Sequence, residues 1–379
     1  MRRVIVSTIG TSLLTNQINR ANPEEKDWYS QLRDAANLNE NDTPEIVKKI
    51  ISILEERANV KLDNVNIPQI RRASAELNGI YGVYQEDLSK GKEDYHFLIA
   101  TDTIQGTTTA QIVETFLRKQ GLTNTSIYAP SGLSTASTET FSVGIDDLIV
   151  WLQETIPPLR ESKYKICFNL VGSFKSLQGY LNTIGMFYAD EIIYIFEGEK
   201  SDLITIPRLP ISVDTSLFEP YTMQLALLDS GAGLSPQETT GIPETMLGEV
   251  DGKMVLSTWG NLIWNQCKED LLSGDLIPFS RLEYQDTFRA DYNRVREKHK
   301  RVKLQETLAT VTRLLNESNG NTAILKEHKG IQYGKLTNKG DIDHFRVTQS
   351  VRVSCAFSQG KLNLYHYGEQ HDDINNNPY

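Results

Sequence analysis

The first half of the chain alternates short apolar runs with longer stretches in which apolar residues recur every three or four positions. One such stretch carries Ile46, Ile50 and Leu54, a spacing that places them on one face of a helix. A later helical stretch is expected to stop at Pro157-Pro158, because proline interrupts helices. The strand-like runs cover residues 4–7, 96–100, 125–128, 166–170 and 192–196, and a further run over 203–206 predicts a closing hairpin. This alternation predicts an α/β fold with a mainly parallel sheet.

The pattern changes twice further along the chain. Residues 213–278 are rich in loops, with a hairpin turn at Asp251-Gly252 and one helix over 259–272, and are expected to form a small linker module. After them come a short strand over 282–284, two helical stretches and three strand-like runs over 345–347, 352–357 and 362–367. The sequence therefore predicts three parts: residues 1–212, residues 213–278 and a C-terminal α+β domain over 279–379.

Composition narrows the class of protein. The chain has 379 residues, 39% of them hydrophobic, and a formal net charge of −10. Those values are typical of a globular chain, and no apolar stretch approaches the roughly 20 residues that cross a membrane. The three cysteines, Cys167, Cys267 and Cys355, are too scattered to predict a disulfide framework or a metal site. We therefore expect a cytoplasmic protein with no membrane contact.

Positive charge nevertheless gathers in one segment of this acidic chain. Between residues 289 and 303 only Asp291 and Glu297 oppose seven basic residues: Arg289, Arg294, Arg296, Lys298, Lys300, Arg301 and Lys303. A concentrated basic surface is typical of nucleic-acid binding, although a solvated helix face has the same composition.

Small and polar residues follow three of the predicted strands. They are Gly10, Thr11 and Ser12 after the first, Asp102, Thr103, Gly106 and Thr107 after the second, and Asn169, Gly172, Ser173, Phe174 and Lys175 after the fourth. The carboxyl ends of parallel strands meet at one edge of a sheet, where ligands bind. Glycines, hydroxyls and free N–H groups there suit phosphate, although helix capping alone explains any one of the turns. None of the turns has the spacing of a Walker loop or of a dinucleotide fingerprint.

Residues 7–14 and 169–175 resemble the two signature turns of CRISPR-associated Rossmann-fold (CARF) domains, over about residues 1–210. The resemblance implies a homodimer that binds a cyclic oligoadenylate, with cyclic tetra-adenylate as the expected ring and no other cofactor. It also implies that Thr11 and Ser12 contact ribose or phosphate and that Lys175 reaches the phosphates. In the usual second turn two glycines are adjacent, whereas here Ser173 stands in the second place, which bears on whether the ring is only bound or also cut.

The last domain carries residues suited to cutting RNA without a metal. Such cleavage needs a base for the 2′-hydroxyl, a cation for the charged phosphorane and an acid for the 5′ leaving oxygen. Arginine suits the phosphorane and histidine the proton transfers, while tyrosine stacks on bases or orients a proton. The candidates are Arg346, Arg352, His366, His371 and Tyr379.

Residues 280–379 resemble RelE-type toxins, which cut mRNA in the ribosomal A site. The segments that carry the resemblance are the basic run over 289–303, the strand over 350–357 and the chain over 367–371. The resemblance implies Arg352 for the phosphorane, His371 as the acid, Tyr379 for stacking and Arg346 for a phosphate contact. Lys335 and Lys303 are further candidate phosphate contacts.

Together the two resemblances predict a switch, in which cyclic oligoadenylate binding controls a metal-independent endoribonuclease of type III CRISPR defence that acts on mRNA at the ribosome. Two alternatives stay open at this point. One is a ring nuclease that degrades its own activator, and the other is a non-enzymatic regulator in which the CARF domain controls a nucleic-acid-binding module.

Overall fold

A computed structural model describes residues 1–172, 174–195, 202–336, 341–368, 374 and 378. Within it the chain forms two compact units, Met1–Ile211 and Ser212–Tyr379. In the described part of the chain, no helix is long and apolar enough to cross a membrane.

Unit 1 is built on a six-stranded sheet with the order β3-β2-β1-β4-β5-β6. Its strands are β1 (Arg3–Thr8), β2 (Tyr95–Ile99), β3 (Thr125–Tyr128), β4 (Lys165–Asn169), β5 (Glu191–Ile195) and β6 (Leu203–Pro207). All neighbouring pairs are parallel except β5 and β6, which pair antiparallel. The mainly parallel sheet and its antiparallel ending are therefore confirmed. Because β1 lies between β2 and β4, the chain reverses its winding direction at β1, and ligands bind beside such a reversal in open sheets.

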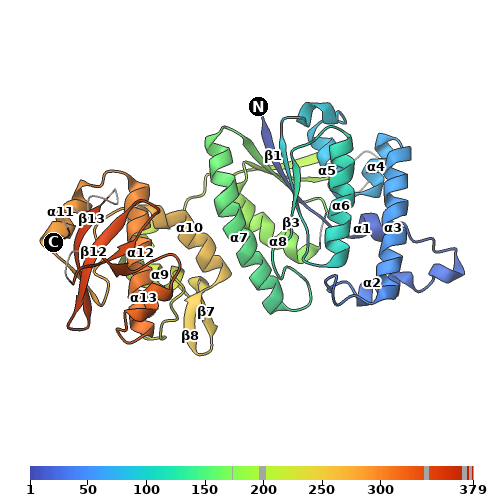
Figure 1. The fold of residues 1–379 in the computed structure, drawn as a ribbon. Coiled ribbons are helices and arrows are strands. Elements are labelled where there is room, and N and C mark those ends of the chain that lie inside the picture. The colour runs from blue at the N-terminus through green and yellow to red at the C-terminus, as the bar shows by residue number, and fades with distance from the viewer. Residues whose placement is uncertain (173, 196–201, 337–340, 369–373, 375–377, 379) are drawn as a thin grey trace. The chain divides into compact units, whose positions relative to one another are not determined.

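Helices cover both faces of this sheet. Figure 1 shows α7 and α8 on one face, and α6 with α3 beyond it on the other. The α-helices of unit 1 are α1 (Ser12–Thr15), α2 (Trp28–Asp34), α3 (Glu45–Asn64), α4 (Ile67–Ala73), α5 (Ala75–Val83), α6 (Ile104–Lys119), α7 (Thr138–Glu161) and α8 (Lys175–Tyr188), with 3-10 turns η1 (Pro23–Glu25) and η2 (Leu88–Gly91). On the α7 face, Trp151 stacks on Tyr128 and meets Phe97 edge-on, which fixes the helix to β2 and β3.

The expected stop at Pro157-Pro158 is wrong, because α7 continues to Glu161 with both prolines inside it. Each proline removes one i→i−4 hydrogen bond, so the helix continues at a local cost. The last turn is also held from outside: Arg160 donates to Asp190 Oδ1 at 2.6 Å and to the Tyr188 carbonyl at 2.6 Å. These tertiary contacts override the local preference.

Unit 2 combines helices with a five-stranded sheet of order β10-β11-β12-β13-β9. Its strands are β9 (Leu282–Tyr284), β10 (Gly334–Lys335), β11 (Asp343–Arg346), β12 (Arg352–Ser358) and β13 (Lys361–Gly368), beside a separate hairpin of β7 (Leu247–Val250) and β8 (Lys253–Leu256). Its helices are α9 (Thr222–Asp229), α10 (Thr258–Leu272), α11 (Asp286–Arg294), α12 (Lys298–Glu317) and α13 (Ala323–Glu327), with 3-10 turns η3 (Thr215–Leu217), η4 (Glu219–Tyr221) and η5 (Glu244–Met246). The sheet is antiparallel from β10 to β13, while β9 joins β13 in parallel.

Residues 213–278 do not form a separate core. Leu225 of α9 and Trp264 of α10 are fully buried, and both belong to the same apolar cluster as Phe288 and Leu308 of the following segment. Lys268 of α10 also bridges to Glu306 of α12 at 3.4 Å. The segment expected to be a linker module is therefore part of unit 2 in the structure.

Candidate functional site

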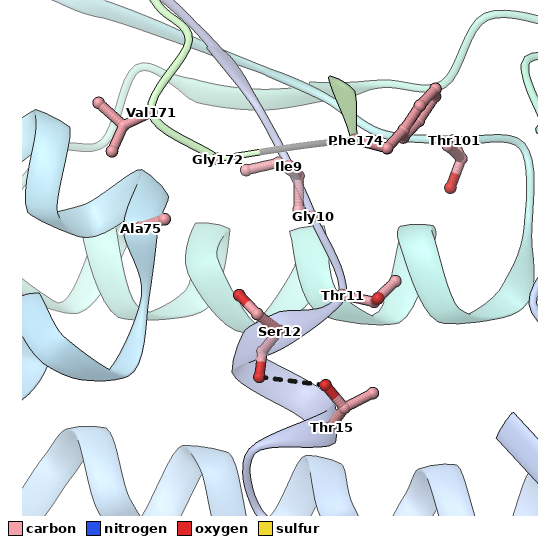
Figure 2. A pocket seen from close by; sticks show the side chains of 10 residues that line it. All are labelled: Ile9, Gly10, Thr11, Ser12, Thr15, Ala75, Thr101, Val171, Gly172 and Phe174. Atoms are coloured by element: carbon pink, nitrogen blue, oxygen red, sulfur yellow. Dashed lines mark hydrogen bonds between the residues drawn. The ribbon is translucent and has the colours of Figure 1, made fainter. Parts of the chain in front are cut away.

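A cavity of about 340 Å³ lies at the carboxyl edge of the unit 1 sheet, where β1 and β4 end. Figure 2 shows the side chains that line it: Ile9, Gly10, Thr11, Ser12, Thr15, Ala75, Thr101, Val171, Gly172 and Phe174. They come from the β1–α1 turn, the start of α5, the end of β2 and the β4–α8 turn. The structure thus brings together the three turns that the strand pattern placed at one sheet edge.

Hydrogen bonds connect the two main turns below this pocket. Thr8 Oγ1 donates to the Gly172 carbonyl. Asn169 Nδ2 donates to Ser7 Oγ and to the Glu76 carbonyl, both at 3.0 Å. Asn169 is fully buried, so this predicted ligand residue connects the turns instead of facing the pocket.

The sequence did not identify Glu76, a buried residue that lies against two residues of the cavity lining, Gly10 and Gly172. Its Oε1 accepts a hydrogen bond from the Gly10 backbone N–H, and its Oε2 accepts one from Ser74 Oγ, both at 2.7 Å. The residue is fully buried, and burial raises the pKa of its carboxyl above the ordinary value. Gly172 lies against the same side chain, and a Cβ at that position would come within 2.7 Å of Glu76 Cγ. Only glycine fits there.

Hydroxyl groups provide the polar lining. Thr11, Ser12, Thr15 and Thr101 all line the cavity, and no charged side chain is found among the described lining residues. Thr15 Oγ1 donates to the Ser12 carbonyl at 3.5 Å, as drawn in Figure 2. The lining therefore suits a ligand that accepts and donates hydrogen bonds.

The two helices that follow the turns differ. α1 has only four residues, too short to act as a strong dipole, whereas α8 has fourteen. The N-cap of α8 is Phe174, which cannot accept from the first N–H groups. Lys175 is the first residue of α8 and is exposed outside the described lining, so its charge adds to the positive end of the helix.

The turn after β2 contributes less than expected. Thr103 Oγ1 caps α6 by accepting from Gly106 N at 3.1 Å, and Thr107 Oγ1 donates to the Thr103 carbonyl at 2.9 Å. Asp102 Oδ2 accepts from Gly132 N at 2.9 Å. None of these three residues, nor Gly106, lines the cavity, and Thr101 alone represents this turn. Capping, the alternative that the sequence left open, accounts for Thr103 and Gly106, while Asp102 binds the loop at Gly132.

In unit 2, strand register brings several predicted residues to one face of the sheet. Arg346 pairs directly with Arg352, and His344, Ser354 and His366 form the row two positions away. Residues opposite each other, or two apart along a strand, share a face. Phe345, Val353 and Tyr367 therefore point to the other face, and they belong to the apolar core.

The two arginines are like-charged neighbours. Burial and the charge of Arg346 both lower the pKa of the Arg352 guanidinium. Arg352 donates to the Gln349 carbonyl at 3.3 Å, and the buried Arg346 Nε has no partner among the described residues. A pair of this kind is stabilised by an anion that binds across both guanidinium groups.

His366 is held by a carboxylate that the sequence treated only as a break in the basic run. Its Nδ1 lies 2.7 Å from Asp291 Oδ2 of α11, and the same oxygen accepts from Tyr367 N at 3.2 Å. Arg294 donates to the other oxygen at 3.1 Å. Asp291 thus fixes the orientation of the His366 ring.

Several other predicted residues are engaged elsewhere or lie outside the description. Lys335 pairs with Asp341 at 3.3 Å and Lys303 with Glu306 at 3.6 Å, so both cations already have carboxylate partners. Ser173, His371 and Tyr379 lie outside the described residues. Within the ranges that the structure describes, no group of histidine, cysteine, aspartate and glutamate side chains could hold a metal ion.

One described residue of the C-terminal segment packs on the arginine-bearing face. Ile374 is buried in a small cluster with Leu336 and Ile342, against Ala356 and Tyr365. Ala356 lies on the same face of β12 as Arg352, and Ile342 directly precedes β11 at an even spacing from Arg346. The face therefore has a cationic half and an apolar half.

Comparison with protein families gives a match in unit 1. Residues 71–209 match the family model described as CRISPR-associated protein (Cas_APE2256). The match begins within α4 and ends after β6, so it includes Glu76, Asn169 and Gly172 but not the β1–α1 turn or unit 2. This segment is similar to CRISPR-associated proteins, which indicates a CRISPR-associated role in defence.

Proposed function

We propose that the protein is a cyclic-oligoadenylate-controlled, metal-independent ribonuclease of CRISPR defence, with unit 1 as the sensor and unit 2 as the nuclease. The observation that carries this proposal is the hydroxyl-lined pocket at the winding reversal of a sheet whose segment 71–209 matches CRISPR-associated proteins. The nuclease half is supported by the arginine pair and the oriented His366 on one face of unit 2.

The size of the pocket supports a shared ligand. About 340 Å³ lies at the small end of the range for ligand sites. A ring of four nucleotides therefore needs the pockets of two copies, which fits a homodimer. The uncapped start of α8 and Lys175 offer N–H groups and a full charge to its phosphates.

The face of unit 2 supplies parts of an RNA-cleaving site. The 2′-oxygen attacks the adjacent phosphorus and the 5′-oxygen leaves, giving a 2′,3′-cyclic phosphate and a 5′-hydroxyl. Arg346 and Arg352 would bind the two non-bridging oxygens as negative charge builds on them. His366, fixed by Asp291, would exchange a proton with the attacking or leaving oxygen.

The test is RNA cleavage in a translation extract with and without cyclic tetra-adenylate, read by mapping the new RNA ends. We expect cuts in mRNA only when the activator is present, because a switch requires the activator to prefer the active arrangement. Arg352→Gln should abolish cutting and leave activator binding unchanged, whereas Lys175→Gln should weaken binding. The matched control is Lys361→Gln, which removes a cation paired with Glu283 on the same sheet.

Equal cleavage with and without the activator would refute the switch. Linear oligoadenylate products without any RNA cleavage would favour a ring nuclease. Activator binding without either reaction would favour a non-enzymatic regulator.

A further inference from the structure

A buried carboxyl beneath a pocket for an anion is an electrostatic conflict. Glu76 is fully buried, and its neighbour Ala75 lines the cavity, as do Gly10 and Gly172, which both contact the Glu76 side chain. Its ionised form takes the Gly10 N–H, a donor at the turn that a bound phosphate would otherwise use. In a medium of low polarity this negative charge would repel a phosphate strongly.

Among the residues that the structure describes, no cation is found against the Glu76 carboxyl. Glu76 is the only carboxylate or cationic residue of α5, whose other titratable group is the phenol of Tyr81, with a pKa raised by burial. On the strands packed against α5, the charged residues Arg3, Lys165 and Glu191 each stand at the first position of β1, β4 and β5, at the end of the sheet away from the pocket. On α4, which also packs against α5, Arg71 binds Asn78 and Glu86, and Arg72 has an interaction of its own. Lys175 lies beyond the β4–α8 turn and is exposed.

We propose that Glu76 is a proton-linked residue of the pocket: wherever its carboxyl is ionised in the empty site, it takes up one proton when an anionic nucleotide binds. This inference rests on the proposed function for the identity of the nucleotide. The proton comes from solvent and stays on the Glu76 carboxyl for as long as the ligand is bound. The neutral acid removes the repulsion while one oxygen still accepts from Gly10 N–H.

The direction of the pH effect follows from this linkage. Burial already favours the neutral acid in the empty protein, and a bound anion favours it further. Between the pKa of the empty site and the higher pKa of the occupied site, binding takes up a proton. The association constant therefore rises as pH falls through that interval, by at most about tenfold per pH unit for one proton.

The experiment is isothermal titration of the full chain with cyclic tetra-adenylate across a pH series, in pairs of buffers with different ionisation enthalpies. For the wild type we expect up to one proton taken up for each occupied pocket, and affinity that rises toward acid. The variant Glu76→Gln keeps an acceptor for Gly10 and a polar group for Ser74, so it should bind with no proton uptake and no pH dependence, and more tightly than wild type at the alkaline end. Glu93→Gln removes the same charge from an exposed position and should behave as wild type.

The wild-type proton count does not depend on any variant folding. Binding with no proton uptake, or a pH profile that Glu76→Gln shares with wild type, overturns this inference and leaves the proposed function standing. Absence of cyclic tetra-adenylate binding at every pH overturns the proposed function and this inference with it.

Discussion

The close approach of Gly172 to Glu76 predicts a specific energetic coupling between the β4–α8 turn and α5. A Cβ at position 172 would lie 2.7 Å from Glu76 Cγ, and real Cβ atoms essentially never come within 3.0 Å of another heavy atom in this way. Neither side can move freely, since Glu76 is fixed by Gly10 and Ser74 and the turn is fixed by Thr8. Overpacking at such a site costs about 1–3 kcal/mol.

Gly172→Ala should therefore lower the melting temperature of unit 1 by roughly 2–12 °C, at about 2–4 °C per kcal/mol for a unit of this size. In the Glu76→Ala background the obstructing side chain is gone, so the same substitution should cost almost nothing. The loss of the Gly10 and Ser74 hydrogen bonds is common to Glu76→Ala and to the double variant, so it cancels in the double-mutant cycle. The coupling energy should equal the cost of the single substitution.

The assay is differential scanning calorimetry of the full chain, resolved into the transitions of the two units. Gly179→Ala is the matched control, because Gly179 is also on the α8 side of unit 1 and a Cβ there would meet no atom within 4 Å. It should raise the stability of unit 1 by about 0.5–1 kcal/mol, the usual gain of alanine over glycine inside a helix. A cost for Gly172→Ala that is unchanged in the Glu76→Ala background would refute the reasoning.

Three further predictions concern the remaining charged groups. Arg352→Gln should raise the melting temperature of unit 2, because it relieves repulsion from Arg346. The same variant should lower the affinity for a short RNA about tenfold to a hundredfold, measured by fluorescence anisotropy. An unchanged affinity would argue against a phosphate contact. Asp291→Asn should lower the rate of activated RNA cleavage at least tenfold, since His366 loses its orienting carboxylate. Calorimetry should show unchanged activator binding. An unchanged cleavage rate would exclude His366 from the reaction. The Arg57 guanidinium lowers the pKa of Glu25 from 4.5 to about 2, so the unfolded state binds more protons than the folded state between these pH values. The stability that this pair provides is complete above about pH 4.5 and is lost as pH falls toward 2. Glu25→Gln should therefore flatten that part of the stability curve in acid denaturation, and identical curves for the variant and the wild type would contradict this prediction.

Sequence reasoning located the pocket because its signal was local. The rule that strand ends of a parallel sheet share an edge needs only the strand–turn–helix order, and Gly10 and Gly172 indeed line one cavity. That rule does not predict which polar residues face the cavity. Thr103 could cap a helix or bind a ligand with the same sequence pattern, and only the direction of its side chain decides between them.

The two carboxylates that matter most to the sites were not recognised. Glu76 stands in the first turn of α5, where a glutamate is common because it complements the helix dipole. Its burial depends on Gly172, which is 96 positions away in the sequence. Asp291 stands within a basic run and pairs with His366, 75 positions away. Pairings of this range depend on the tertiary fold, and no local pattern of residue types encodes them.

The position of β1 in the sheet also affects the order in which parts of the protein can fold during synthesis. β1 is an inner strand, and its neighbours β2 and β4 are synthesised some 90 and 160 residues after it. Such long-range pairings form slowly, and the β1–β4 edge cannot exist until β4 has left the ribosome. Every residue of unit 2 emerges after that point. During each round of translation the strands and turns that form the pocket therefore leave the ribosome before the arginine face is made, so the proposed sensor can fold ahead of the proposed nuclease.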